Sequence, residues 1–170
     1  MKQNPSLGEF INPDQLIVQF GLKENMHVAD FGIGSGYFTI LMAKNVGEQG
    51  VVTALDILEA PLEVVMNKSE LEGFENIKFI RADLEVERGS TLDDSSQDFV
   101  LLANILFQSE QRKNIFKEAA RVTKAGGHIV VIDWKKDTDA LGGPPKEFKI
   151  DPEEIKKLAQ EVELNFISDF

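Results

Sequence analysis

The residues best suited to chemistry lie where predicted strands end. The first such stretch has an acidic residue, Asp30, followed by glycines at Gly32, Gly34 and Gly36. Glycines between a strand and a helix let a ligand approach the backbone closely, because no Cβ blocks the way and positive φ costs little. The helix that follows directs free N–H groups toward the same place. This turn therefore predicts a site for a nucleotide-like ligand.

The spacing of the glycines narrows the choice of ligand. A dinucleotide-binding turn reads G-x-G-x-x-G, and the last glycine of that pattern would fall on Tyr37. The carboxylate of Asp30 would repel a pyrophosphate, whereas it would suit a ligand that carries a sulfonium or an ammonium group. An NAD-dependent oxidoreductase is therefore the less favoured alternative.

Composition indicates one globular domain. The chain has 170 residues, 42% of them hydrophobic, and no cysteine, which excludes disulfides and thiolate metal sites. No apolar run approaches the ~20 residues that span a membrane, and residues 1–5 lack the apolar core of a secretory signal. The net charge of −11 disfavours nucleic-acid binding. We expect a cytoplasmic protein without a bound metal, a nucleic-acid partner or membrane insertion.

Apolar runs alternate with helical patterns, which predicts βαβ units. The expected strands cover residues 28–31, 51–56, 77–82, 99–104, 128–132 and 165–170. The expected helices run from a cap at Asn12, with Ile11 as a hydrophobic staple, to Gly21, over 36–46, from about Pro61 to Gly73, from a cap at Ser109 to residues 125–127, and from Asp151 through Val162. The polar residues 85–97 are expected to form a loop. The predicted fold class is α/β, a Rossmann-like, doubly wound, mainly parallel sheet with helices on both faces.

Ligands of such a sheet bind at the carboxyl ends of its strands. The second strand ends at Asp56, about 20 residues beyond the glycines, where a carboxylate can accept hydrogen bonds from both ribose hydroxyls. Asp56 would serve an NAD enzyme equally well, and alone it could also be a helix cap or an ordinary loop residue. The third strand ends at Asp83, the fourth at Asn104 and the fifth at Asp133, so that each strand end has a polar residue.

Together these segments, over residues 10–134, resemble the class I S-adenosylmethionine-dependent methyltransferases. Residues 10–13, 133–136 and 143–145 resemble the small-molecule branch that contains type 11 and ubiquinone/menaquinone-biosynthesis-like enzymes. The resemblance implies S-adenosylmethionine as cofactor and S-adenosylhomocysteine as product. It implies cofactor contacts from Asp30, Gly32, Gly34, Gly36, Asp56, Ile57, Ala82, Asp83, Leu84 and Asn104, and it makes Tyr37, Gln108, Asp133 and Trp134 candidates for the acceptor side. Tyr37 and Trp134 are equally compatible with simple packing.

The whole chain, residues 1–170, is expected to form one S-adenosylmethionine-binding domain. Residues 1–25 would be a helical cap, 26–134 the cofactor-binding core, and 135–170 an acceptor-side loop, helix and last strand. The family's seventh, antiparallel strand has no sequence left to form it, so either the gene product continues or the sixth strand pairs differently. An open sheet edge would invite pairing with another chain, which could produce a homo-oligomer.

Methyl transfer from a sulfonium depends mainly on positioning, and a general base is needed only if the acceptor must lose a proton. His27 and His128 begin strands and would lie at the opposite edge, so no catalytic residue is assigned. We expect a methyltransferase for an unidentified small-molecule acceptor. The alternative is a non-catalytic or partner-dependent binding module. The lysines and arginine at Lys113, Lys117, Arg121 and Lys124 are expected to form a solvated helix face.

Overall fold

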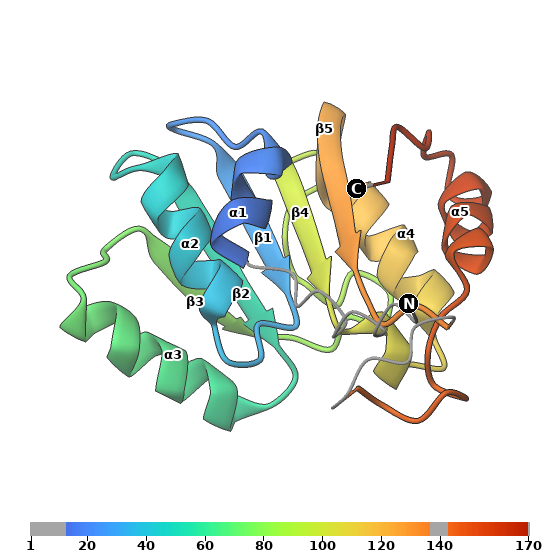
Figure 1. Cartoon of the computed structure of the whole chain (residues 1–170). Helices are drawn as coiled ribbons and strands as arrows, with labels where there is room; N and C mark the ends of the chain where they lie inside the picture. The colour runs from blue at the N-terminus through green and yellow to red at the C-terminus, as the bar shows by residue number, and fades with distance from the viewer. Residues whose placement is uncertain (1–12, 137–142, 170) are drawn as a thin grey trace, which may run out of the picture.

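The computed structural model describes residues 13–136 and 143–169, which form a sheet with helices on both faces (Figure 1). All strand pairs are parallel, in the order β3-β2-β1-β4-β5. The strands are β1 (His27–Phe31), β2 (Val51–Asp56), β3 (Ile77–Arg81), β4 (Gln97–Ala103) and β5 (Thr123–Ile132). The helices are α1 (Pro13–Leu16), η1 (Ile17–Phe20), α2 (Tyr37–Val46), α3 (Glu59–Leu71), η2 (Leu106–Gln108), α4 (Arg112–Val122) and α5 (Pro152–Glu161). The predicted parallel α/β architecture is confirmed.

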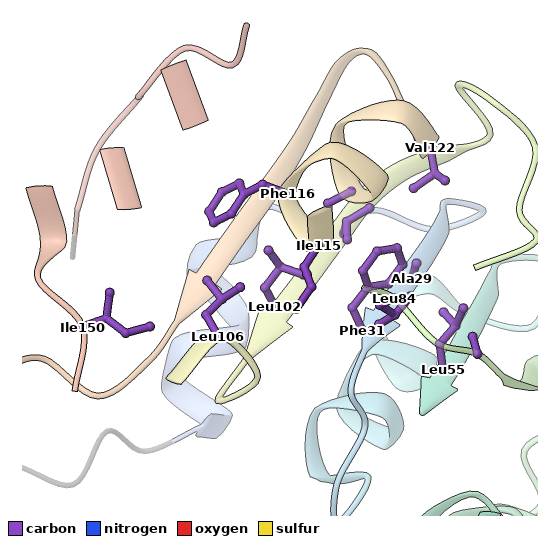
Figure 2. Packing of buried hydrophobic residues seen from close by; sticks show 13 residues of the cluster. Ala29, Phe31, Leu55, Leu84, Leu102, Leu106, Ile115, Phe116, Val122 and Ile150 are labelled. Carbon is purple, nitrogen blue, oxygen red and sulfur yellow. The ribbon is translucent and has the colours of Figure 1, made fainter. Parts of the chain in front are cut away.

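Alternate residues of the central strands point to opposite faces of the sheet. Val28 and Leu101 pack against η1 and α2, whereas Ala29 and Leu102 pack against α4. Figure 2 shows the second group, in which Phe116 of α4 lies in the same cluster as Leu102. Because both faces are covered by helices, β4 is an unbroken apolar run from Phe99 to Ala103 rather than an alternating one.

Several helix ends lie where the sequence predicts them. Gly21 follows η1 in the left-handed conformation, with φ of 66°. Asp151 caps α5, and its carboxylate accepts a hydrogen bond from the Glu153 N–H at 2.9 Å. The predicted cap at Asn12 and staple at Ile11 lie outside the described residues. None of the helices within residues 13–136 and 143–169 is long and apolar enough to cross a membrane.

The boundary between α4 and β5 differs from the prediction. Helix α4 ends at Val122 and β5 begins at Thr123, so Gly126 and Gly127 lie inside the strand and do not end the helix. The Thr123 hydroxyl donates to the Ala119 carbonyl at 2.7 Å and so satisfies the last turn of α4. The register of β5 against β4 shifts at this point, which accommodates the glycines.

The start of α4 also differs. The Ser109 hydroxyl accepts a hydrogen bond from the Gln111 N–H at 2.9 Å. This contact forms a turn before the helix, and α4 begins only at Arg112 without a side-chain cap. Ser109 therefore ends the preceding loop rather than capping the helix.

The predicted sixth strand is wrong. Residues 164–169 form no strand, and the described residues contain no antiparallel strand. Ile150 instead forms a parallel bridge with Lys135, and its N–H donates to the Trp134 carbonyl at 2.8 Å. This buried residue thus lies beside the chain just beyond the carboxyl end of β5. A strand requires a neighbour for its backbone groups, and the pattern of side chains after α5 does not specify one.

Candidate functional site

A cavity of about 720 Å³ lies at the carboxyl edge of the sheet, where the loops after β1, β2, β3 and β4 meet. Of the predicted cofactor contacts, those that line it are Asp30, Gly32, Gly34, Asp56, Ile57, Ala82, Asp83, Leu84 and Asn104. Tyr37 and Gln108, predicted for the acceptor side, line it as well. Gly36, Asp133 and Trp134 are not among its lining residues. The topology thus brings most of the predicted site together.

Asp30 lies at the end of β1 and is only 2% exposed. The Thr39 hydroxyl, on α2, donates to one carboxylate oxygen at 2.6 Å. Burial raises the pKa of Asp30 from 3.8 to about 6, against the lowering effect of the Thr39 hydrogen bond, and the charge of Asp56 raises it further. A cation in the cavity would favour the ionised carboxylate.

The three glycines of the turn meet different needs. Gly32 has φ of 80°, and a Cβ there would lie 2.8 Å from Cδ1 of Ile105. Gly34 has φ of 49° and would have nothing within 4 Å of a Cβ, so its backbone is open to the cavity. A Cβ on Gly36 would lie 2.4 Å from both methyl carbons of Val65, on α3. Gly36 therefore serves the packing of the turn against α3.

The carboxylate of Asp56 is oriented by two backbone groups. One oxygen accepts from the Gly34 N–H at 3.3 Å, and the other accepts from the Leu58 N–H at 3.0 Å. Asp83, at the next strand end, accepts from the Glu85 N–H at 3.0 Å. Both carboxylates line the cavity in fixed orientations, with lone pairs left for a ligand.

Tyr37 joins the glycine turn to α1. Its hydroxyl donates to the Asp14 carboxylate at 2.9 Å, and its side chain is 43% exposed. The hydrogen bond to Asp14 raises the pKa of Tyr37, and desolvation adds to this. Pro13 and Phe38 also line the cavity. These two residues were missed because no chemical motif marks them, although Pro13 was predicted to begin the helix.

The cavity is strongly acidic. Four carboxylates line it, from Asp30, Asp56, Asp83 and Glu85, and no lysine, arginine or histidine is among its described lining residues. Within residues 13–136 and 143–169 no group of three or more histidine and carboxylate side chains could hold a metal ion. The cavity therefore suits a ligand with positive charge more than one with phosphates.

Asp133 and Trp134 make other contacts. One carboxylate oxygen of Asp133 accepts from the Leu106 and Phe107 N–H groups at 3.0 and 3.2 Å, and the other accepts from the Trp134 N–H at 2.8 Å. Burial raises the pKa of Asp133, although these three hydrogen bonds act to lower it. The ring of Trp134 packs so tightly on Gly143 that a Cβ there would lie 2.7 Å from it.

Comparison with known proteins decides the family. Residues 22–166 match the profile of a family described as "Methyltransferase domain". The chain belongs to the methyltransferase family. A demethylmenaquinone methyltransferase of Staphylococcus aureus (strain MRSA252) is 30% identical over 125 residues, which are 73% of this chain and 49% of that protein. The ubiquinone/menaquinone biosynthesis C-methyltransferase UbiE of Idiomarina loihiensis is 28% identical over 71% of this chain and 47% of that protein. This methyltransferase chain thus spans about half the length of these relatives.

A solved structure supports the same assignment. A SAM-dependent methyltransferase from Aquifex aeolicus aligns with a TM-score of 0.81 and 29% sequence identity, over 94% of this chain and 82% of that one. The Rossmann-like fold and the membership of class I, with likeness to the UbiE branch, are therefore confirmed. The fold shared with this methyltransferase therefore covers nearly the whole chain.

Proposed function

We propose that this methyltransferase domain binds S-adenosylmethionine in the acidic cavity and transfers a methyl group to a small-molecule acceptor. The observation that carries the proposal is Asp30, a buried carboxylate with a pKa of about 6 beside an open glycine turn. Within the part of the chain that the structure describes, Thr39 and Asp56 are the side chains that act on this carboxylate and neither is a cation, so a cationic ligand would supply the missing charge. S-adenosylmethionine brings a methyl group on a positively charged sulfur.

The lining residues fit distinct parts of this cofactor. In the proposal, Asp30 and the backbone of Gly32 and Gly34 receive the methionine end, because close approach and negative charge coincide there. Asp56 accepts hydrogen bonds from the ribose hydroxyls, and Asp83 accepts one from the adenine amino group. Ile57, Ala82, Leu84 and Asn104 complete the walls. Gly36 supports the turn through Val65 without touching the ligand.

The acceptor is proposed to be a small molecule without phosphate or carboxylate groups. Among the described residues the cavity has no cationic side chain that could bind such groups, and four carboxylates would repel them. Tyr37 and Gln108 are the proposed acceptor contacts. The names of two relatives refer to demethylmenaquinone and to ubiquinone/menaquinone biosynthesis. A quinone ring carries no charge, so a quinone-like acceptor agrees with this charge balance. The absence of cysteine argues against thiol-based arsenite methylation.

The remaining parts of the proposal concern the whole chain. It comprises one domain, with the segment before β1 as a helical cap and the segment after β5 on the acceptor side. It acts in the cytoplasm and does not bind nucleic acid, in keeping with its charge of −11. A homo-oligomer through the exposed edge of β5 is the proposed mode of self-association.

Calorimetric titration with S-adenosylmethionine, S-adenosylhomocysteine and NAD tests the cofactor. We expect binding of the two sulfur compounds and none of NAD, and the reverse result would refute the proposal. Transfer of tritium from labelled cofactor to a set of quinol and other neutral acceptors then tests the reaction. Binding without any transfer would favour a non-catalytic or partner-dependent module.

The variant Asp56→Ala tests the placement of the ribose. Loss of one or two charge-assisted hydrogen bonds should weaken S-adenosylhomocysteine binding by about 2–4 kcal/mol. Circular dichroism and thermal unfolding verify that the variant is folded, since Asp56 also holds Gly34 and Leu58. Unchanged affinity in a folded variant would remove Asp56 from the site.

A further inference from the structure

We infer that Asp133 is a positioning residue, which holds the loop of residues 104–108 where that loop forms one wall of the cavity. Asp133 lies directly after β5 and does not itself line the cavity. The identity of the ligand rests on the proposed function, whereas the hold on the loop rests on contacts within the chain.

The side chains of residues 104–108 face two different surroundings, the cavity and the hydrophobic core. Asn104, Ile105 and Gln108 line the cavity, whereas Leu106 is fully buried in the cluster beneath it. Figure 2 shows Leu106 between Ile150 and Leu102, two other members of this cluster. A shift of the Leu106 backbone would therefore move the cavity-lining residues on either side of it.

Leu106 is held through its side chain and through both backbone groups. Its N–H donates to the Asp133 carboxylate at 3.0 Å, and its carbonyl accepts from Nε of Arg112 at 2.9 Å. The same oxygen of Asp133 accepts from the Phe107 N–H at 3.2 Å. Asp133 thus holds the N–H groups of this segment, and Arg112 holds the Leu106 carbonyl.

The loop also packs against the glycine turn. Ile105 lies so close to Gly32 that a Cβ there would be 2.8 Å from Cδ1 of Ile105. Asn104 has φ of 54°, a left-handed conformation that asparagine adopts more readily than most residues with a side chain. Its backbone is fixed by the Asn104 N–H bond to the Ile132 carbonyl at 2.7 Å and by Nε2 of Gln108, which donates to the Asn104 carbonyl at 2.7 Å. These bonds fix the start of the loop at Asn104, and the Asp133 carboxylate fixes the peptides of Leu106 and Phe107 that follow it.

The variant Asp133→Asn tests this role. Three N–H groups approach both oxygens of Asp133, so in either orientation the asparagine amide nitrogen would face a backbone donor. The matched control is Asp151→Asn, which also removes one charge from a capping carboxylate but lies at the start of α5. Asparagine caps a helix about as well as aspartate does, so this control should remain unperturbed.

Two readouts are needed, amide hydrogen exchange resolved by NMR and the dissociation constant of S-adenosylhomocysteine. In Asp133→Asn we expect the Leu106 and Phe107 amides to exchange about tenfold faster and the ligand to bind about tenfold more weakly, through the loss of charge-assisted hydrogen bonds. Asp151→Asn should change neither quantity. Faster exchange with unchanged affinity, or weaker affinity with unchanged exchange, would each overturn the inference.

Further measurements separate this inference from the proposed function. If wild-type protein does not bind S-adenosylhomocysteine, the proposed function fails, and the exchange data alone still decide whether Asp133 holds the loop. If Asp133→Asn does not fold, Arg112→Gln removes the opposite contact and should accelerate exchange and weaken binding in the same direction. Rapid exchange of the Leu106 and Phe107 amides in the free wild-type protein would overturn the inference without any variant.

Discussion

At the scale of single residues, the ionised carboxylate of Asp30 lowers the stability of the folded chain. Its carboxylate is buried, and its pKa of about 6 lies above the 3.8 expected in the unfolded chain. Folding therefore favours the protonated form, and the native state loses stability relative to the unfolded state as the pH rises from about 4 to 6. A site that carries such a cost before its ligand arrives is typical of function rather than of stability.

The variant Asp30→Asn should stabilise the ligand-free protein. An amide avoids the ionisation cost and its oxygen can still accept from Thr39, so the gain should be about 3 kcal/mol at pH 8 and roughly half of that at pH 5. Urea unfolding at the two pH values measures it. The same variant should bind S-adenosylmethionine at least about tenfold more weakly. A variant that is less stable than wild type at pH 8 would contradict the pKa shift.

The residues of the site were predictable where a motif marks a strand end, and not elsewhere. Asp30, Asp56 and Asp83 all line the cavity, because parallel strands deliver their carboxyl ends to one edge. Asp133 also follows a strand, but its contacts are with backbone N–H groups of a loop 26 and 27 residues earlier in the chain. No spacing rule in the sequence indicates that contact, since it depends on how the loop after β4 folds.

At the scale of elements, the turn between β1 and α2 is locked against α3. Gly36 has φ of 71° and fits directly against Val65, whereas Gly34 has a similar backbone with open space around it. Alanine at Gly34 would therefore test the cost of the backbone conformation alone, whereas alanine at Gly36 would add the cost of crowding against Val65.

Gly36→Ala should be more destabilising than Gly34→Ala. Both variants incur a left-handed conformation, about 1–2 kcal/mol, but only Gly36→Ala adds overpacking, about 1–3 kcal/mol. Denaturant unfolding of both variants measures the difference. Val65→Ala in the Gly36→Ala background should recover part of the crowding cost, and equal stabilities of the two single variants would show that α3 moves aside freely.

Helix α4 holds the irregular segment after β3 through a buried ion pair. Arg121 was predicted to lie on a solvated helix face, which is wrong, because its side chain is only 17% exposed and bonds both oxygens of Glu118 at 2.7 and 2.9 Å. The buried Ser90 donates its N–H to Glu118 at 3.0 Å. The spacing of basic residues on a helix does not reveal that a distant loop covers one of them.

Glu118→Gln should lower the free energy of unfolding by about 1.5–3 kcal/mol, because it removes the buried charged partner of Arg121 and leaves only the exposed Asp94 to pair with it. The control Glu161→Gln removes an exposed partner of Lys113 and should cost no more than about 1 kcal/mol. Thermal and denaturant unfolding report both. A similar small loss in both variants would mean that Arg121 is satisfied by Asp94 alone.

Strand boundaries were best predicted where the residues at both ends mark them. The bounds of β2 agree with the prediction at both ends, because an apolar run is bracketed by a glycine and a carboxylate. The prediction of a strand after α5 was wrong for a different reason. Apolar residues such as Phe166 and Ile167 were read as a strand, yet they are 52% and 74% exposed and have no neighbouring strand among the described residues. Pairing partners are a property of the assembled sheet and not of the local pattern.

At the scale of the whole molecule, charge should govern the choice between related ligands. The chain has a net charge of −11, and the described lining of the cavity has carboxylates without basic side chains. Such a field attracts cations and is weakened by salt.

S-adenosylmethionine has one more positive charge than S-adenosylhomocysteine, so its affinity should depend more strongly on salt. Between about 0.02 and 0.5 M salt we expect the ratio of the two affinities to change by roughly threefold in favour of the homocysteine compound. Calorimetry at several salt concentrations measures this ratio, and Asp30→Asn should reduce the change. A ratio that is constant with salt would show that the cavity does not discriminate by charge.

The order of the strands has a consequence for the newly synthesised chain. The central strand β1 pairs with β2 soon after it in the sequence, but its other neighbour, β4, lies much later, and the His27 N–H contacts Asp98 across 71 residues. Until β4 emerges from the ribosome, an apolar strand has an open edge, which is where nascent chains associate wrongly. Long-range pairing of this kind also slows folding. The central strand β1 therefore keeps an open edge for most of the time in which the domain is being made.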